Sequence, residues 1–192
     1  MKKLIMAIGA AMMFAAGPAF AGEAALTADA AKRFVASLPS VESLGKKLEA
    51  EGRTDEMRVD TQPKPGEEFK PFSNAVKSLK VKYPSDYGQL SSALKPHGFN
   101  AEDWGLAGDQ VMIAYLALKM EKENPGVMAQ MEAIDPEMLK MMPPEMKAQM
   151  EQAKMMMATV AAASPEDKKA VAEVEDELDA YMESQASQHS MH

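Results

Sequence analysis

The chain has 192 residues, no cysteine, 19 methionines and a formal net charge of −8. This length suits one domain, or one domain with a flexible arm, and the 46% hydrophobic and 26% charged residues exclude a fully disordered chain. The lack of cysteine excludes disulfides, thiolate metal sites, thiol nucleophiles and a lipoprotein anchor. The negative charge argues against nucleic-acid binding, because little counterion would be released from phosphates.

The first 21 residues have the three parts of a cleavable export signal. Lys2 and Lys3 give a positive start, residues 4–16 are apolar, and Ala19-Phe20-Ala21 is a small-x-small cleavage motif. The apolar stretch is too short to span a bilayer comfortably, and no second stretch of spanning length follows. We therefore expect cleavage after Ala21 and a soluble mature chain in the periplasm, or a secreted one.

Residues 22–126 are expected to form a domain of short helices, since good helix formers dominate and period-two alternation is missing. Thr27 is the expected N-cap of a helix that ends at Pro39. Ser40 would then cap a second helix, which stops at Gly52. The polar residues 53–68 predict a loop or linker.

Further helices are expected over residues 69–82 and from Ser85 to Leu94, the latter closed by Pro96 and Gly98. The clearest helix covers residues 101–123, with Asn100 as its N-cap. Apolar residues recur in it at three- and four-residue spacing and should face the core: Trp104, Ala107, Val111, Tyr115 and Leu118.

Residues 127–184 are expected to form a methionine-rich helical region. One helix should run from Pro144 to about Ala163, and Ser164 should cap a last helix that ends near Ser184. Two apolar stripes joined by a tight turn predict an antiparallel helical hairpin. Residues 185–192 are expected to be a disordered tail. The predicted fold class is all-α.

Ten methionines lie between Met128 and Met157. Methionine is a flexible apolar residue that fills cores and also forms adaptable binding surfaces. We expect such a surface to bind another protein or an exported polypeptide, as a scaffold or a small chaperone would, and full burial of its methionines would contradict this. The candidate partner-binding residues are Met141, Met142, Met146, Met150 and Met157.

Copper binding is the alternative, because thioether sulfur is a soft ligand that suits Cu(I) and two nearby imidazoles can chelate Cu(II). Against it, no histidine lies between His97 and His189. The candidate metal ligands are Met138, Met142, Met146, His189 and His192.

An enzyme is the third interpretation, and we do not expect one. The sequence has no glycine-rich phosphate loop, nucleophile elbow or zinc-protease motif. Asp103 and Asp109 lie on different faces of their predicted helix, so they do not form a pair of catalytic carboxylates. A catalytic site would need a concave pocket lined by polar groups near Trp104 and Tyr115.

Three stretches resemble small exported helical proteins of proteobacteria, a group without a settled activity. They are residues 26–28 (LTA), residues 33–39 (RFVASLP), and residues 98–104 (GFNAEDW) with Gly108-Asp109. The resemblance covers roughly residues 26–120 and leaves out the methionine-rich region. It implies a helical fold and export, and it transfers no catalytic residue.

The copper alternative predicts that the metal-free protein takes up Cu(I) and that a Met138→Leu/Met142→Leu/Met146→Leu variant loses this uptake. Leucine keeps the apolar character and the helix propensity while it removes the sulfur. Titration with Cu(I) checks the prediction, and unchanged uptake by the variant would contradict it.

Overall fold

A computed structural model of the chain describes residues 25–52, 69–126 and 143–189. Over these ranges every regular element is helical, which confirms the all-α class. The elements are α1 (Ala28–Ala50), α2 (Pro71–Lys82), α3 (Pro84–Leu94), the short 3₁₀ helix η1 (Lys95–His97), α4 (Ala101–Glu123), α7 (Pro144–Ala161), α8 (Pro165–Ala172) and α9 (Glu175–His189).

None of the helices in these ranges combines the length and the apolar character that a membrane span requires.

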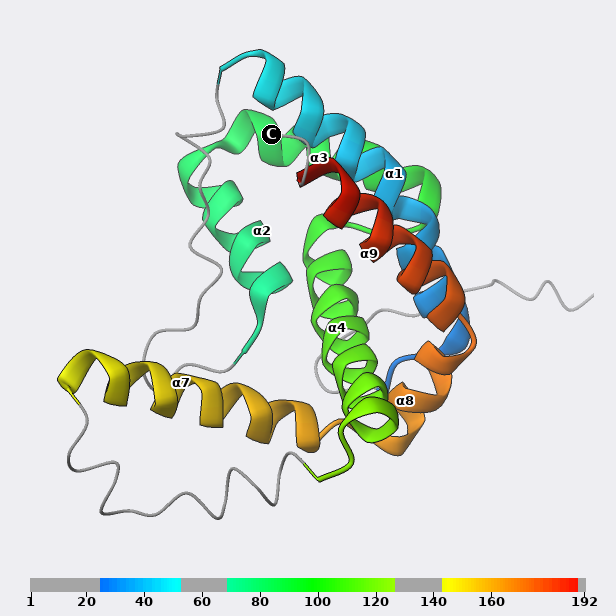
Figure 1. Cartoon of the computed structure of the whole chain (residues 1–192). Coiled ribbons are helices and arrows are strands. Elements are labelled where there is room, and N and C mark those ends of the chain that lie inside the picture. The colour runs from blue at the N-terminus through cyan, green and yellow to red at the C-terminus, as the bar shows by residue number, and fades with distance from the viewer. Residues whose placement is uncertain (1–24, 53–68, 127–142, 190–192) are drawn as a thin grey trace, which may run out of the picture.

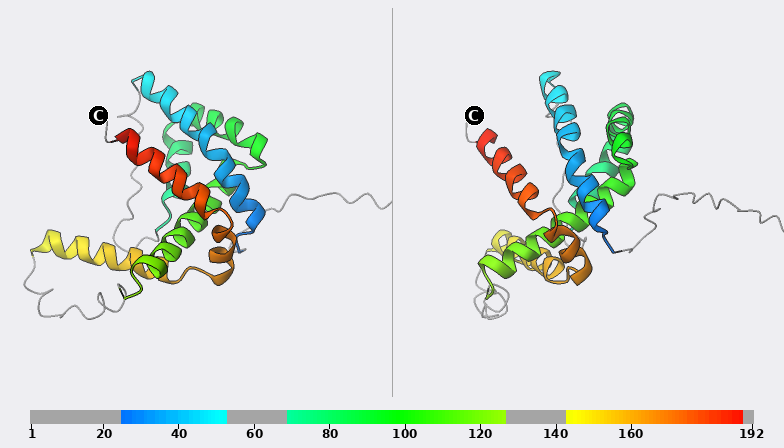
Figure 2. Two further views of the ribbon diagram at one scale, coloured as in Figure 1. Left: turned by 45° about the vertical axis from the view of Figure 1, so that its right-hand side comes forward. Right: turned by 90° about the vertical axis from the view of Figure 1, so that its right-hand side faces the viewer.

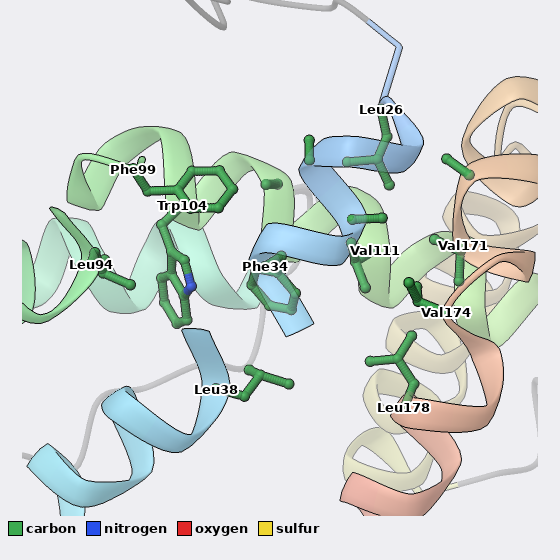
Figure 3. Close-up of a cluster of buried hydrophobic side chains, with 14 of the residues drawn as sticks. Leu26, Phe34, Leu38, Leu94, Phe99, Trp104, Val111, Val171, Val174 and Leu178 are labelled. Carbon is green, nitrogen blue, oxygen red and sulfur yellow. The ribbon is translucent and has the colours of Figure 1, made fainter. Parts of the chain in front are cut away.

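Helix α4 lies at the centre of the molecule and contacts most of the others (Figure 1). Helix α2 packs along one side of it, α1 and α8 pack on the other, and α7 crosses near its C-terminal end. One hydrophobic core joins α1, α2, α3, α4, α8 and α9 and includes Phe34, Leu94, Trp104, Val111 and Val171. Figure 3 shows Trp104 and Phe34 on one side of this core and Val171 and Leu178 on the other.

Three of the four predicted N-caps are confirmed, and the fourth is wrong because Ser40 lies inside α1. The side-chain oxygens of Thr27, Asn100 and Ser164 each accept a hydrogen bond from the backbone N–H three residues further on, at 3.1, 2.7 and 3.0 Å. Each bond satisfies one of the donors that the first turn of a helix leaves unpaired. The predicted stop at Gly52 is also confirmed, since this residue has φ of +70°, which a side chain would disfavour.

The predicted end of the first helix at Pro39 is wrong, because α1 continues through this residue to Ala50. Proline inside a helix costs about 3 kcal/mol, since it removes a hydrogen bond and crowds the preceding turn. Tertiary packing offsets this cost here: Phe34 and Leu38 before the proline and Leu48 after it are all buried. The Pro39 ring itself is exposed, so it interrupts the helix only on the solvent side.

The predicted single last helix is also wrong. Helices α8 and α9 are separate, and α9 continues past Ser184 to His189, into the segment expected to be a disordered tail. No proline or glycine stands at the break, but Glu173 forms an ion pair there with Lys32 of α1, at 2.8 Å. The local sequence therefore gives no signal for this boundary.

The structure does not confirm the antiparallel hairpin. The apolar residues Val171, Val174 and Leu178 join the core with α1 and α4 and do not form a pair of stripes with α7. Helix α9 is also tied to α4 through Asp179, which accepts hydrogen bonds from Tyr115 at 2.6 Å and Lys119 at 2.7 Å. Figures 1 and 2 show α7 running away from the other two C-terminal helices.

Helix α2 approaches α4 closely because glycines stand at the contact. A Cβ atom added at Gly108 would lie 2.6 Å from the Phe72 ring and 2.9 Å from the Phe34 ring. At Gly105 it would lie 3.1 Å from the Cα atom of Ser73. Glycine inside a helix costs roughly 0.5–1 kcal/mol relative to alanine, so these two positions lose helix propensity and gain close packing.

We predict that Gly108→Ala lowers the free energy of unfolding by about 1–3 kcal/mol, because the new methyl group overpacks the two aromatic rings. Gly88→Ala is the matched control, since Gly88 lies inside α3 with nothing within 4 Å of an added Cβ. That change should stabilise the protein by up to about 1 kcal/mol. Urea unfolding measures both, and equal effects of the two changes would contradict the packing argument.

Candidate binding groove

An apolar groove of about 880 Å³ lies between α2, α4 and α7. Its volume is within the range of about 300–1,000 Å³ that is usual for ligand sites. The residues that line it come from the start of α2 and the segment before it, from the first two thirds of α4 and from one face of α7: Phe69, Pro71, Phe72, Ala75, Trp104, Met112, Leu116, Gln149, Gln152, Ala153 and Met156. Among them, only the two glutamines and Trp104, through its indole N–H, carry polar side-chain groups.

The innermost wall of the groove is aromatic. The ring of Phe72 meets the ring of Trp104 edge to face, with centroids 5.4 Å apart, and Phe34 stacks on Trp104 at 5.4 Å. The Trp104 indole N–H donates to the Ser37 hydroxyl at 2.8 Å, and this hydroxyl donates to the Phe34 carbonyl at 2.6 Å. Because the indole N–H is already bonded inside the protein, Trp104 offers the groove only its apolar ring.

The α2 wall is held in place by Asp109 of α4. The residue before α2, Lys70, makes no side-chain cap, so the first turn of α2 needs acceptors from elsewhere. The Asp109 carboxylate accepts from the backbone N–H of Phe72 at 2.7 Å and of Ser73 at 3.2 Å. Burial raises the pKa of Asp109, and the hydrogen bonds from Ser73 and Phe72 oppose this rise.

A second tie holds the other end of α2. Glu102 of α4 accepts hydrogen bonds from Lys80 of α2, at 2.6 Å, and from Tyr87 of α3. The bond from Lys80 first and the bond from Tyr87 second lower the pKa of Glu102 to about 2. The α2 wall is therefore fixed to α4 near both of its ends.

Among the described side chains of α7, the buried one lies near its C-terminal end. Val160, near the C-terminus of α7, is 1% exposed, and beside it lies a smaller hollow lined by Ala117 and Met120 of α4. The residues that face the large groove, Gln149, Gln152, Ala153 and Met156, follow the i, i+3, i+4, i+7 spacing of a single helix face. The start of α7 extends beyond the other helices (Figure 1).

The predicted partner-binding methionines that the structure describes lie on α7 but do not line the groove. Met141 and Met142 lie outside the described residues. Met146 is 51% exposed on α7, and Met150 and Met157 are half-buried. None of these three is among the described lining residues, whose methionines are Met112 and Met156.

Sequence reasoning did not single out Met112 and Met156. Met156 lies in the methionine cluster, and its spacing from Gln149, Gln152 and Ala153 was the available signal. Met112 is on α4 next to the buried Val111, and no pattern in the sequence marked it. Asp109 was likewise overlooked, since its partners belong to another helix.

The structure does not bring together the predicted metal ligands that it describes. Met138, Met142 and His192 lie outside the described residues. Met146 is near the start of α7 and His189 is the last residue of α9, and Figure 1 shows these two helix ends in different parts of the molecule. Within the described ranges, no group of three histidine, aspartate or glutamate side chains could hold a metal ion.

The surroundings of Trp104 are concave, as a catalytic site would require, but the described lining residues include no titratable side chain. Tyr115 is instead bonded to Asp179, and burial first and this carboxylate second raise the pKa of Tyr115 to about 12. The arrangement is suited to holding an apolar group rather than to moving a proton.

Comparison of the chain with protein-family models, curated proteins and solved structures found no match.

We predict that Asp109→Ala lowers the free energy of unfolding by about 1–3 kcal/mol, because it leaves the Phe72 and Ser73 N–H groups without their acceptor. Asp109→Asn keeps an acceptor oxygen and should cost less. Since the pKa of Asp109 is raised from 3.8 in the fold, the contribution of this residue to stability should fall as pH rises through the interval above 3.8.

The asparagine variant cannot ionise at this position, so the difference in stability between it and the wild type should change across that pH interval. Urea unfolding at several pH values measures this difference. A constant difference would contradict the assignment of a raised pKa to Asp109.

Proposed function

We propose that this chain is an exported helical binding protein whose groove takes up an apolar segment of another polypeptide. The observation that carries the proposal is the groove between α2, α4 and α7, with Trp104 and Phe72 on one side and Met156 on the other. Its walls are apolar apart from two amide side chains. Methionines adapt their shape to different partners, which suits a site that accepts varied sequences, as a chaperone or scaffold does.

The geometry of the α7 wall favours a helical ligand. Residues 149–156 span two turns, or about 10 Å at 1.5 Å per residue. Amphipathic helices dock into apolar grooves through anchors with this same spacing. We therefore propose that the ligand is an amphipathic helical segment of an exported polypeptide.

Charge favours a basic ligand. The whole chain carries a net charge of −8, and removal of the proposed signal with Lys2 and Lys3 would leave 19 basic and 29 acidic residues, or −10. Such a field accelerates association with positively charged partners and slows association with acidic ones. The proposed ligand thus has leucine-like residues on one face and lysine or arginine on the other.

Trp104 provides the readout of the test, because it is the only tryptophan in the chain and lines the groove. Titration with a synthetic helical peptide of leucine and lysine, with leucines at i, i+3, i+4 and i+7, should produce a saturable change in tryptophan emission. A peptide of the same composition with scrambled spacing should bind at least about tenfold more weakly, since it cannot form one apolar face.

Two variants locate the binding. Ala153→Lys places a long charged side chain in the groove and should weaken binding of the peptide at least about tenfold. Ala158→Lys is the matched control, because Ala158 is also exposed on α7, lies outside the described lining and adds the same charge. Equal effects of the two variants, or binding of a free fatty acid in preference to the peptide, would contradict the proposal.

A further inference from the structure

Two thioethers from different helices line the groove. Met112 comes from α4 and Met156 from α7, and both side chains are half-buried, so solvent reaches them in part. The chain has 19 methionines and no cysteine. Thioether sulfur is therefore the only sulfur in this protein that an oxidant can attack.

We propose that Met112 and Met156 are oxidation sites through which a peroxide-class oxidant lowers the affinity of the groove for its apolar ligand. This inference rests on the proposed function, since it concerns the regulation of the same groove. In each reaction the methionine sulfur attacks one oxygen of hydrogen peroxide, a sulfur–oxygen bond forms and the oxygen–oxygen bond breaks. The sulfur loses two electrons, and the peroxide is reduced to water.

Oxidation to methionine sulfoxide makes the lining of the groove more polar. A sulfoxide is a polar hydrogen-bond acceptor, whereas a thioether is apolar. A docked apolar helix face would have to strip water from the sulfoxide without offering a donor in exchange. Enzymes that reduce methionine sulfoxide reverse the change, so the groove would regain its affinity.

Exposed methionines outside the groove can be compared with the two methionines that line it. Met146 and Met182 are 51% and 43% exposed, so they should oxidise at least as fast as the groove residues. Neither is among the residues that line the large groove. Their oxidation should therefore leave the affinity unchanged, although it consumes the same oxidant.

The experiment compares three proteins before and after treatment with hydrogen peroxide: the wild type, Met112→Leu/Met156→Leu, and the matched control Met146→Leu/Met182→Leu. Leucine keeps the apolar volume at small cost in stability and cannot be oxidised. Anisotropy of a labelled leucine–lysine peptide gives the dissociation constant. Peptide mapping by mass spectrometry gives the oxidised fraction at each methionine, and circular dichroism confirms that the helices remain.

Treatment should weaken peptide binding by the wild type and by the Met146→Leu/Met182→Leu control about tenfold or more, which corresponds to one polar group buried without a partner. The affinity of the Met112→Leu/Met156→Leu variant before treatment serves as its own reference, and treatment should leave that affinity unchanged, since leucine cannot be oxidised. Sulfoxide reductase should restore the affinity of the treated wild type.

An equal loss of affinity in the Met112→Leu/Met156→Leu variant would overturn the inference. So would a mass map in which Met112 and Met156 remain thioethers after Met146 and Met182 are fully oxidised. Failure of the untreated wild type to bind the peptide is a separate result, because it contradicts the proposed function before any oxidant is added.

Discussion

The Asp109 carboxylate at the N-terminal end of α2 is the interaction on which the rest of this structure depends. It is a charged group with 4% of its surface exposed, and burial of this kind is costly unless hydrogen bonds compensate. Here the compensation comes from the backbone N–H groups of Phe72 and Ser73, which belong to a helix without a cap of its own. The buried carboxylate of α4 and the uncapped N–H groups of α2 thus satisfy each other's hydrogen-bonding needs. Because Phe72 lies at this junction, the same bonds set the position of the aromatic wall of the groove.

The close packing around that junction explains why α4 contains glycine at two interior positions. Gly105 admits the backbone of α2 at Ser73, and Gly108 admits the ring of Phe72, which then reaches Trp104 and Phe34. A larger residue at either position would push α2 outward and lengthen the bonds to Asp109. Gly108 therefore leaves space for the Phe72 ring of α2, and Asp109 accepts hydrogen bonds from the N–H groups at the start of the same helix. We regard the two residues as one structural unit that couples helix packing to groove geometry.

Local signals in the sequence were sufficient to predict the helical class, three of four N-caps and most helix starts, because capping and helix propensity act within a few residues. The errors arose where contacts between distant residues prevail. Helix α1 passes through Pro39 because its two halves share one buried face, and α8 separates from α9 next to the ion pair of Glu173 with Lys32. The role of Asp109 could not be predicted, since its partners are 36 and 37 residues away in the chain. The groove escaped prediction for the same reason, because its three walls come from three helices.

The three C-terminal helices have different roles, because α8 and α9 contribute to the core and α7 lines the groove. Helices α8 and α9 and the turn between them supply Val171, Val174 and Leu178 to the core, so they complete the fold that α1 and α4 begin. Helix α7 contributes one fully buried apolar residue among its described side chains, Val160, near its C-terminal end. A helix whose other described apolar side chains are half-buried or exposed can adjust the width of the groove at a lower cost than a helix packed into the core along its whole length. The flexible side chain of Met156 can also change its conformation to fit ligands of different shapes. The groove therefore has one wall tied to α4 by Asp109 and Glu102 and one wall with fewer described buried side chains, and this asymmetry suits the proposed binding of apolar segments of different shapes.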